Sequence, residues 1–513
     1  MSLNSIGRDI PDSHVGSRLL YQGPWARTPE GLRHAPPLGS IRPGDSKIIP
    51  SLREAIAASG LRDGMTVSFH HHLRNGDHVL NMVMEVIAGM GIRDLTVAPS
   101  SLFPVHGPLV DHIRKGVVRG LQTNYALGPV AEAVSRGELP TPMILRTHGG
   151  RVRAIEAGEL AIDVAFIAAP AADPYGNING VYGPSACGSL GYAAADAQHA
   201  RFVVAVTDNL MPYPLRPVSI PQTRVDAVVV VDKLGEPKDI VSGSTRITRD
   251  PVGLLIARSA AEVIDGAGLI KEGMSFQTGA GGTSLAVAAF VRRYMEERKI
   301  TASFGMGGTT GYFVQMLRDG LLRSLLDTQC FDLEAVESLR DDPRHVEVDC
   351  GYYANPWNKG AVVNLLDTVV LGATEIDTDF NVNVVSSSDG IIMGGSGGHA
   401  DTAAGARLAL IVTTTRRTRL PIIRDRVTTV TTPGETVDVV VTETGVAVNP
   451  RRADLADRLR ERGLPVVSIE DMKKQIQDLT GKPSPAAVTD RVVALVEYRD
   501  GSLLDVVYQV KQD

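Results

Sequence analysis

The stretch Ile162–Ile167 (IDVAFI) precedes Asp173–Asn179 (DPYGNIN), and the same pair of features returns as Leu366–Leu371 (LDTVVL) and Asp377–Asn383 (DTDFNVN). Both parts recur at an offset of 204 residues (366 − 162 and 377 − 173). A short apolar strand followed by a D-x-x-x-N-x-N turn is therefore present twice. Two copies of one unit, placed face to face, would leave a cleft between them, and such clefts usually hold small-molecule chemistry.

The repeat extends beyond this pair of features. Asp63–Met65 and Glu272–Met274 match at an offset of 209 (272 − 63), and Ala200–Val204 and Ala406–Leu410 match at 206 (406 − 200). The small drift in offset implies few loop insertions. Two unrelated α/β domains could also look alike at this level, but Asp/Asn turns that match at one offset favour a duplication.

Strands and helices alternate along both copies. In the first copy, an apolar run at Met65–Phe69 is followed by helical spacing over Val79–Ile87. This order predicts an α/β fold in which each of two similar domains has an open, mostly parallel sheet covered on both faces. We expect an extended N-terminal arm over residues 1–48, a first domain over 49–240 and a second domain over 241–513.

The composition excludes some classes of function. The chain has 513 residues, too many for one ordinary core, and its 43% hydrophobic content is typical of a globular protein. Its formal net charge is −6, which argues against a nucleic-acid-binding surface. An anionic substrate would therefore need a local group of cationic side chains, because the overall field does not attract it.

The cysteines and the N-terminus indicate the compartment. Cys187, Cys330 and Cys350 form no C-x-x-C pair, and an odd number of cysteines is not a disulfide framework. We therefore expect a cytoplasmic protein. Residues 1–23 are polar, without the apolar core of a signal peptide, and no apolar run reaches the ~18 residues of a membrane span, so no membrane association is expected.

A polar segment follows the first predicted strand. His70, His71, His72 and Arg74 lie where that strand enters a helix, which is the carboxyl edge of the sheet. An arginine and histidines at this edge could hold a polycarboxylate. Alternating side chains in an extended segment mean that at most His70 and His72 share a face. A zinc site and a purely structural role are the alternatives, and the spacing gives little support to a metal.

Three glycine-rich turns are expected after strands of the second copy. They are Phe276–Ser284, Ser303–Gly311 and Gly394–Asp401. Glycines after a strand can turn backbone N–H groups towards an oxyanion at a helix N-terminus. The first turn does not have the spacing of a dinucleotide-binding motif. His399 is either a core or capping histidine or an acid–base group at neutral pH.

Together these segments closely resemble the family of bacterial citrate lyase alpha subunits, the citrate CoA-transferases. The resemblance rests on Asp63–His71, Gly149–Val152, Asp173–Asn179, Ser275–Gly279, Glu375–Asn383 and Ser396–Asp401. It runs from about residue 50 to the C-terminus and does not include the N-terminal arm.

The resemblance implies two CoA-transferase domains with the active site between them. It also implies that an acetyl thioester on the acyl-carrier (gamma) subunit is exchanged for citrate, which gives a citryl thioester and acetate. A beta (lyase) subunit would then cleave the citryl thioester. The chain would have no cofactor and no metal of its own, would act on the CoA-like prosthetic group of the carrier or on CoA thioesters, and would form a homo-oligomer.

One departure from the wider superfamily bears on the mechanism. Many members carry a catalytic glutamate in an S-E-N-G loop, whereas Ser303–Thr310 has no carboxylate. We therefore expect a direct route through a mixed anhydride, without a covalent enzyme intermediate. The alternatives are a CoA-transferase for another acid, such as citramalate, and a non-catalytic docking subunit. The two-copy layout disfavours a sugar-phosphate isomerase or a ribose-type binding module.

The predicted site residues follow from position in this scheme. We expect the catalytic groups to be Gly279, Gly281, Gly307, Gly308 and His399, with backbone N–H groups as oxyanion donors. We expect the substrate-binding residues to be His70, His71, Arg74, Gln277, Thr278, Ser396, Gly397 and Gly398.

Overall fold

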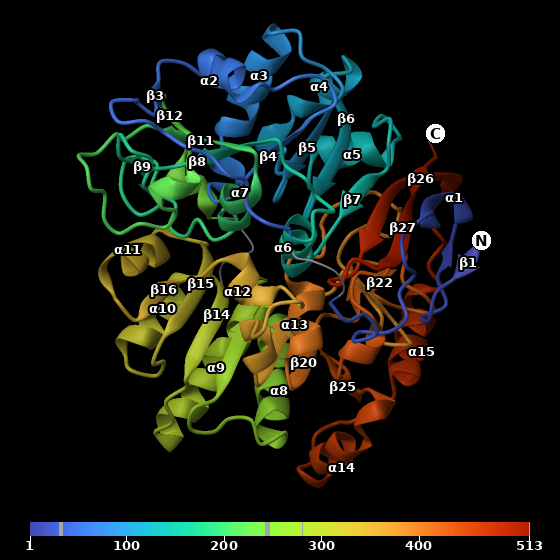
Figure 1. Cartoon of the computed structure of the whole chain (residues 1–513). Helices are drawn as coiled ribbons and strands as arrows, with labels where there is room; N and C mark the ends of the chain where they lie inside the picture. The colour runs from blue at the N-terminus through green and yellow to red at the C-terminus, as the bar shows by residue number, and fades with distance from the viewer. Residues whose placement is uncertain (30–33, 242–246, 280, 512–513) are drawn as a thin grey trace.

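The computed structural model describes residues 1–29, 34–241, 247–279 and 281–511. Two large sheets form two lobes, one above the other in Figure 1. The first sheet has the strand order β27-β26-β7-β6-β5-β4-β8-β11-β12-β3, and the second has β16-β15-β14-β13-β17-β20-β24-β25. The run β7-β6-β5-β4-β8-β11-β12 corresponds strand for strand to β16-β15-β14-β13-β17-β20-β24. All these neighbours are parallel, so the duplicated, mostly parallel α/β fold is confirmed.

The strands have the following bounds. The first sheet contains β3 Ile48–Ile49, β4 Thr66–Phe69, β5 Leu95–Pro99, β6 Val118–Thr123, β7 Met143–Leu145, β8 Val164–Ala168, β11 Phe202–Thr207, β12 Ala227–Val230, β26 Val488–Glu497 and β27 Leu503–Val510. The second contains β13 Ser275–Thr278, β14 Phe304–Thr309, β15 Leu325–Cys330, β16 His345–Glu347, β17 Thr368–Leu371, β20 Leu408–Val412, β24 Val439–Thr442 and β25 Gly445–Val448. Smaller sheets contain β1 Ser2–Leu3, β2 Asp9–Ile10, β9 Ala171–Ala172, β10 Ile178–Asn179, β18 Glu375–Asp377, β19 Val382–Asn383, β21 Arg416–Arg417, β22 Leu420–Pro421 and β23 Ile423–Arg424.

Helices cover the sheets. They are α1 Asp12–Val15, α2 Leu52–Ser59, α3 Val79–Gly89, α4 Leu109–Arg114, α5 Pro129–Ser135, α6 His148–Glu156, α7 Ala194–His199, α8 Pro251–Gly266, α9 Gly282–Arg298, α10 Gly311–Arg318, α11 Leu333–Asp341, α12 Cys350–Ala354, α13 His399–Gly405, α14 Ala453–Glu461 and α15 Ile469–Thr480. The 3-10 turns are η1 Arg74–Gly76, η2 Pro104–His106, η3 Gln222–Arg224, η4 Pro237–Ile240, η5 Val362–Leu365, η6 Gly434–Thr436 and η7 Pro450–Arg452. Among the described residues, no helix combines the length and the apolar character needed to span a bilayer.

The central strands are apolar because they are covered on both faces. Every residue of β8 and every residue of β17 is buried, as the continuous runs VAFIA and TVVL predict for strands of a doubly covered sheet. Helix α2 shows how local signals set the element ends. The Ser51 side chain accepts a hydrogen bond from the Glu54 N–H at its start, and Gly60, at φ 69°, ends it in a left-handed conformation.

The repeated D-x-x-x-N-x-N motif encodes one turn in both lobes. Asp173 Oδ1 accepts hydrogen bonds from the N–H groups of Tyr175 and Asn177, and Asp377 Oδ1 accepts from the N–H groups of the two matching residues. The fourth position is left-handed in both copies, at φ 91° for Gly176 and φ 65° for Phe380. A phenylalanine in that conformation costs about 1–3 kcal/mol, so the surrounding buried residues must stabilise it.

The C-terminal hairpin corrects the predicted domain division. We assigned residues 241–513 to the second domain, but β26 pairs in parallel with β7, and β27 pairs with β26. Residues 488–510 therefore complete the first sheet and cover an edge strand that would otherwise be exposed. Two helices of this final segment pack against the second lobe, α14 on β25 and α15 on β22, β23 and β25. The pattern of apolar and polar residues in a C-terminal strand does not indicate which sheet edge that strand joins.

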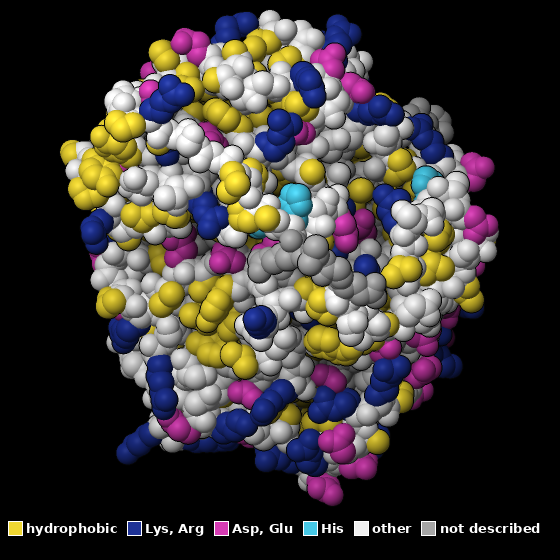
Figure 2. Space-filling model, in the orientation of Figure 1, with side chains coloured by type: hydrophobic (Ala, Val, Ile, Leu, Met, Phe, Trp, Pro, Cys, Tyr) yellow, Lys and Arg dark blue, Asp and Glu magenta, His cyan; other side chains and the backbone are white. Residues whose placement is uncertain are grey.

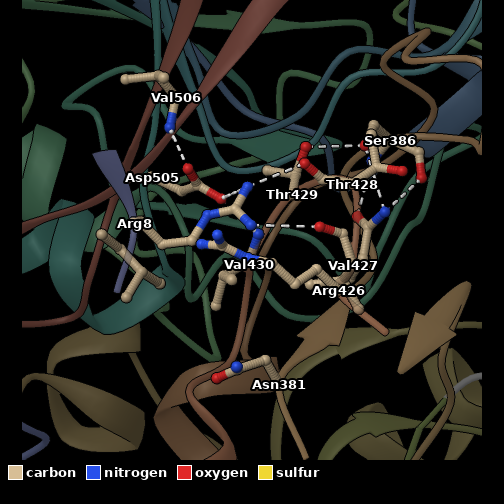
Figure 3. A network of polar contacts seen from close by, with 12 residues as sticks. Arg8, Asn381, Ser386, Arg426, Val427, Thr428, Thr429, Val430, Asp505 and Val506 are labelled. Atoms are coloured by element: carbon tan, nitrogen blue, oxygen red, sulfur yellow. Dashed lines mark hydrogen bonds and ion pairs between the residues drawn. The ribbon is translucent and has the colours of Figure 1, made fainter. Parts of the chain in front are cut away.

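The N-terminal arm packs on the body of the protein. The Leu503 N–H donates to the Leu19 carbonyl over 2.8 Å, so the arm runs along β27. Further on, β3 pairs with β12 at the opposite edge of the same sheet. Figure 3 shows Arg8 of the arm among residues of the C-terminal hairpin and the second lobe, where its guanidinium lies 2.6 Å from Asp505 and donates to the Thr428 carbonyl. The arm thus links both edges of the first sheet.

Candidate active site

The turns at the strand ends of the two lobes contact each other. Gln329, near the end of β15, donates from Nε2 to the His71 carbonyl over 2.9 Å. The Gly397 N–H donates to the Asn124 carbonyl over 3.2 Å, and the His148 N–H donates to the Gly397 carbonyl over 2.8 Å. The carboxyl ends of both sheets therefore share one boundary, which is where open α/β sheets bind ligands.

The three consecutive histidines point in two directions, as the alternation of an extended segment predicts. The rings of His70 and His72 stack at 5.6 Å with an interplanar angle of 8°, and His70 Nε2 lies 3.3 Å from Asp196. The His71 ring instead contacts Tyr192, with ring centroids 4.3 Å apart. His70 is thus separated from His71, so the two do not form the joint substrate-binding pair that we predicted.

His71 belongs to an aromatic cluster between the lobes. Its ring lies 6.1 Å from the ring of His148, which in turn lies 4.6 Å from Tyr192. Ser100 Oγ accepts from the His71 N–H and lies 2.5 Å from Nδ1 of the ring. Burial, together with the nearby His148 and Arg74, lowers the pKa of His71 well below its usual value. The ring is therefore neutral at pH 7 and can donate one hydrogen bond.

Arg74 is held between aromatic rings from both lobes. Its guanidinium lies 5.3 Å from the Phe103 ring centroid and 4.6 Å from that of Phe331, which follows β15. Each such cation–π contact stabilises the position of a cation by about 0.5–2 kcal/mol. The backbone of Arg74 has φ 52°, a left-handed conformation that is uncommon outside glycine and that gathers at ligand sites. Burial lowers the pKa of Arg74, yet a guanidinium stays protonated at neutral pH.

Gly307 and Gly308 lie inside a strand and not in the turn that we predicted. Both belong to β14, whose register against β15 shifts between them, so they form an irregularity of the kind that often re-aims side chains near active sites. A Cβ on Gly308 would lie 2.2 Å from the Phe331 ring, and one on Gly307 would lie 2.8 Å from the Gln277 side chain. These glycines thus make room for Phe331 and Gln277.

The turn after β13 is only partly available as an oxyanion site. The Gly279 N–H donates to the Val370 carbonyl over 2.7 Å, which extends the sheet, so the prediction that it is an oxyanion donor is wrong. Ala280 lies outside the described residues. Gly281 is the N-cap of α9, whose first N–H groups have no acceptor within the helix. The hydroxyl of Thr278 is buried and has no hydrogen-bond partner among the described residues.

Gln277 connects two of the predicted segments. Its Nε2 donates to the Tyr353 hydroxyl over 3.0 Å. A Cβ on Gly398 would lie 2.5 Å from that hydroxyl, and one on Gly397, which has φ 49°, would lie 3.3 Å from His148 Nε2. The Ser396 hydroxyl is buried, without a hydrogen-bond partner within the described part of the chain. These contacts bring Gln277, Ser396, Gly397 and Gly398 together beside the aromatic cluster.

His399 has a structural role. Its Nδ1 lies 2.7 Å from the Thr432 hydroxyl, and its Nε2 donates to the Gly372 carbonyl over 2.9 Å. Burial lowers the pKa of His399 to about 4, although the bond to Gly372 opposes the shift. The ring is therefore neutral at pH 7 with both nitrogens occupied. Of the predicted roles, a core histidine fits, whereas a helix cap and an acid–base group do not.

The buried carboxylates near the boundary already have partners. Asp196 lies 2.6 Å from Arg151. Burial would raise the pKa of Asp196, but Arg151, His70 and Ser68 together outweigh burial and lower it to about 2. Asp401 accepts hydrogen bonds from the Thr147 hydroxyl and the Gly149 N–H. Burial raises the pKa of Asp401 to about 6, against the effect of Arg499. Among the described residues, no three His, Cys, Asp or Glu side chains are placed to hold a metal ion.

Several residues of this cluster were not predicted. They are Phe103, His148, Tyr192, Phe331 and Tyr353. His148 begins α6 directly after β7, so the rule that singled out His71 could have found it. The four aromatic residues carry no motif, because they come from loops and a short helix that only the tertiary fold brings together.

Two parallel lobes of one strand order that meet at their strand ends form the fold of the CoA-transferase class. The alpha subunit of a malonate decarboxylase from Acinetobacter baumannii shares it, with 17% identity and a TM-score of 0.63 over 85% of this chain and 92% of that one. RipA from Yersinia pestis also shares this fold, with 17% identity and a TM-score of 0.58 over 85% of this chain and 97% of that one.

A narrower family also matches. The model of the family "Citrate lyase, alpha subunit (CitF)" matches residues 45–510. The citrate lyase alpha chain of Escherichia coli K12 is 53% identical over 91% of this chain and 92% of its own length. The citrate lyase alpha chain of Klebsiella pneumoniae is 51% identical over 91% of this chain and 92% of its own length. A crystal structure described as the alpha subunit of citrate lyase in complex with citrate, from Streptococcus mutans, has 48% identity and a TM-score of 0.97, over 99% of this chain and 100% of that one. The chain belongs to the citrate lyase alpha subunit family.

Proposed function

We propose that the protein exchanges the acetyl group of an acetyl thioester for citrate and releases acetate. The thioester would be carried by the CoA-like prosthetic group of an acyl-carrier subunit. The observation that carries the proposal is the Arg74 guanidinium held between Phe103 and Phe331, beside His71, at the boundary of the lobes. A fixed cation next to neutral donors suits a polycarboxylate. The citrate in the Streptococcus mutans relative supports the same substrate.

The exchange balances without any other reactant. A carboxylate oxygen of citrate attacks the acetyl carbonyl carbon, the C–S bond breaks, and the electron pair leaves with sulfur as a thiolate. The product is a mixed citryl–acetyl anhydride. The thiolate then attacks the citryl carbonyl carbon, the bond between that carbon and the bridging oxygen breaks, and the oxygen leaves with the electron pair as part of acetate. No net proton is taken up or released in either step.

The protein would contribute position and hydrogen bonds to this chemistry. Holding the carboxylate against the thioester is worth about 7–11 kcal/mol when the orientation is ideal. The hydroxyls of Thr278 and Ser396 are buried without a hydrogen-bond partner among the described residues, which costs about 1–3 kcal/mol each. A developing oxyanion would satisfy them, and each well-placed donor lowers the barrier by about 3–4 kcal/mol.

A direct route is favoured over a covalent one. The segment Ser303–Thr310 holds no Asp or Glu, and the buried Asp196 and Asp401 are already bonded to cations or N–H groups. A carboxylate in such a bond is a poor nucleophile. No residue of this cluster is therefore proposed to become acylated.

The proposed partners follow from the family. A beta subunit would cleave the citryl thioester, a gamma subunit would carry the CoA-like arm, and the chain would form a homo-oligomer. It would use no cofactor of its own.

The isolated chain provides the test. Acetyl-carrier subunit, or acetyl-CoA in its place, is incubated with citrate, and citryl thioester and acetate are measured together. Equal amounts of both products are expected, and replacing citrate with citramalate or short acids should lower the rate. Absence of exchange by the isolated chain would make it a docking subunit. Treatment with hydroxylamine during turnover should label no carboxyl group of the protein, and a labelled Asp or Glu would refute the direct route.

A further inference from the structure

An arginine-rich hairpin stands at the edge of the second sheet. β21 (Arg416–Arg417) and β22 (Leu420–Pro421) pair in an antiparallel way around Thr418, which has φ 53°. Arg416, Arg417 and Arg419 are all exposed. Arg416 Nη1 donates to the Thr418 carbonyl over 2.9 Å and so braces the turn. One short hairpin, stabilised by its own hydrogen bonds, therefore carries three cationic side chains.

The hairpin lies next to the glycine turn of the candidate site. It follows β20 at the carboxyl edge of the sheet, and Arg417 Nη2 donates to the Ala373 carbonyl over 3.2 Å. The preceding carbonyl, of Gly372, accepts from His399, which directly follows Gly397 and Gly398. The same short backbone segment thus holds both the hairpin and the turn that lines the site.

The charges of this hairpin are not neutralised by the described part of the chain. Arg416 and Arg417 donate to backbone carbonyls, and none of the three arginines forms an ion pair with the described residues. The carboxylate of Glu443, near its base, accepts bonds from the N–H and hydroxyl of Thr415. By contrast, Arg458 and Arg460 of α14 pair with aspartates at 3.2 and 2.8 Å. Figure 2 shows basic and acidic side chains mixed in this way over the lower lobe.

We propose that the hairpin of Arg416, Arg417 and Arg419 binds the phosphate groups of the CoA-type arm while its thioester reaches the site. This inference rests on the proposed function. The chain has a formal net charge of −6, so an anionic arm needs a local cationic surface. Guanidinium groups match phosphate oxygens in pairs, which a solvated lysine does less well. Anchoring the phosphates beside the glycine turn leaves the thioester end to extend between the lobes.

The test compares CoA with pantetheine, the phosphate-free thiol part of CoA. CoA has a diphosphate and a 3′-phosphate, whereas pantetheine has neither the phosphates nor the adenosine that they join. In a triple variant, Arg416→Ala, Arg417→Ala and Arg419→Ala, the Kd for CoA should rise by about tenfold or more, because charge-assisted bonds are lost. The Kd for pantetheine should stay within twofold. The triple Arg→Lys variant should recover part of the affinity for CoA. The control is Arg458→Ala, Arg460→Ala and Arg462→Ala, which removes three charges near α14 and should leave both affinities unchanged.

The binding readout separates this inference from the proposed function. If CoA binds in an arginine-dependent way but no acetyl exchange occurs, the proposed function is wrong and the phosphate site stands. If the hairpin variant binds CoA as well as the parent does, or loses CoA and pantetheine equally, the phosphate site is refuted. Weaker binding of the carrier subunit with unchanged CoA affinity would also refute it, because the hairpin would then contact the carrier protein and not its arm.

Discussion

The turn after β4 and the turn after β13 occupy the same place in the two lobes but are built differently. The first presents side chains, His71 and Arg74. The second is mostly glycine, and its Gly279 N–H is used to extend the sheet. One lobe thus carries the groups that can bind a polyanion, and the other contributes glycines that make room for the neighbouring Phe331 and Gln277. Changes in the first lobe should therefore affect substrate affinity directly, whereas changes in the second should act through packing.

The largest effect is expected for Arg74→Ala. This change removes the cation proposed to bind a citrate carboxylate, and losing a charge-assisted bond should raise the KM for citrate about 100-fold. Arg74→Lys should recover only part of the loss, since an ammonium lacks the planar fork. Steady-state kinetics against citrate measures this, with the exposed Arg62→Ala as a control. A KM within twofold of the parent would exclude Arg74 from the site.

Gly308→Ala should come next and tests the second lobe. The new Cβ would lie 2.2 Å from the Phe331 ring, so Phe331 must move and Arg74 loses one of its two aromatic contacts. We expect a loss of about 1–3 kcal/mol of stability from overpacking and a citrate KM raised about tenfold. Thermal unfolding and kinetics measure the two effects.

The matched control is Gly360→Ala, where a Cβ would meet nothing within 4 Å. Adding Phe331→Leu to Gly308→Ala should restore stability without restoring the KM. If the double variant recovered both, Phe331 would not be what positions Arg74.

Phe331→Leu alone should have a smaller effect. It removes one cation–π contact, worth about 0.5–2 kcal/mol, so the citrate KM should rise several-fold while kcat changes little. Phe290→Leu is the control, because Phe290 lies under Arg293 at 5.1 Å on α9, in the second lobe. An equal change in both variants would mean that the effect is general and not specific to the site.

The smallest effect on exchange is expected for His399→Gln, which should stay within about twofold at pH 7 because the ring is neutral and structurally bonded. The pKa of His399 is lowered to about 4 in the fold, against 6.5 ordinarily. Between these values the unfolded chain binds a proton that the folded ring does not, so stability falls as the pH drops from 6.5 to 4. Urea unfolding at several pH values should show a shallower fall in the variant. An unchanged pH dependence would contradict the assignment.

The sequence predicts the lobes well where apolar runs are continuous. β8 and β17 were predicted because every residue is apolar or β-branched and buried. β15 was missed because Asp327, Thr328 and Gln329 interrupt its pattern; the fold buries them by bonding, for example Asp327 to His345. The attachment of β26 to β7 was also missed, since partner choice over a long sequence distance leaves no local signal.

The candidate site was predictable only for residues at strand ends. His71 and Arg74 follow β4 directly, and position alone placed them at the carboxyl edge. The roles of Phe331 and Tyr353 depend on contacts between lobes, which spacing cannot show. Gly307 and Gly308 were predicted as oxyanion donors in a turn, but the structure places them in β14, against the side chains of Gln277 and Phe331.

The closure of the first sheet by β26 and β27 has a consequence for synthesis on the ribosome. The strands next to β7 emerge early, whereas residues 488–510 emerge only after the second lobe. Until then, β7 has an unpaired edge that can pair with another nascent chain. The lobe made first is therefore finished last, and a premature stop near the C-terminus would damage the N-terminal lobe more than the neighbouring one.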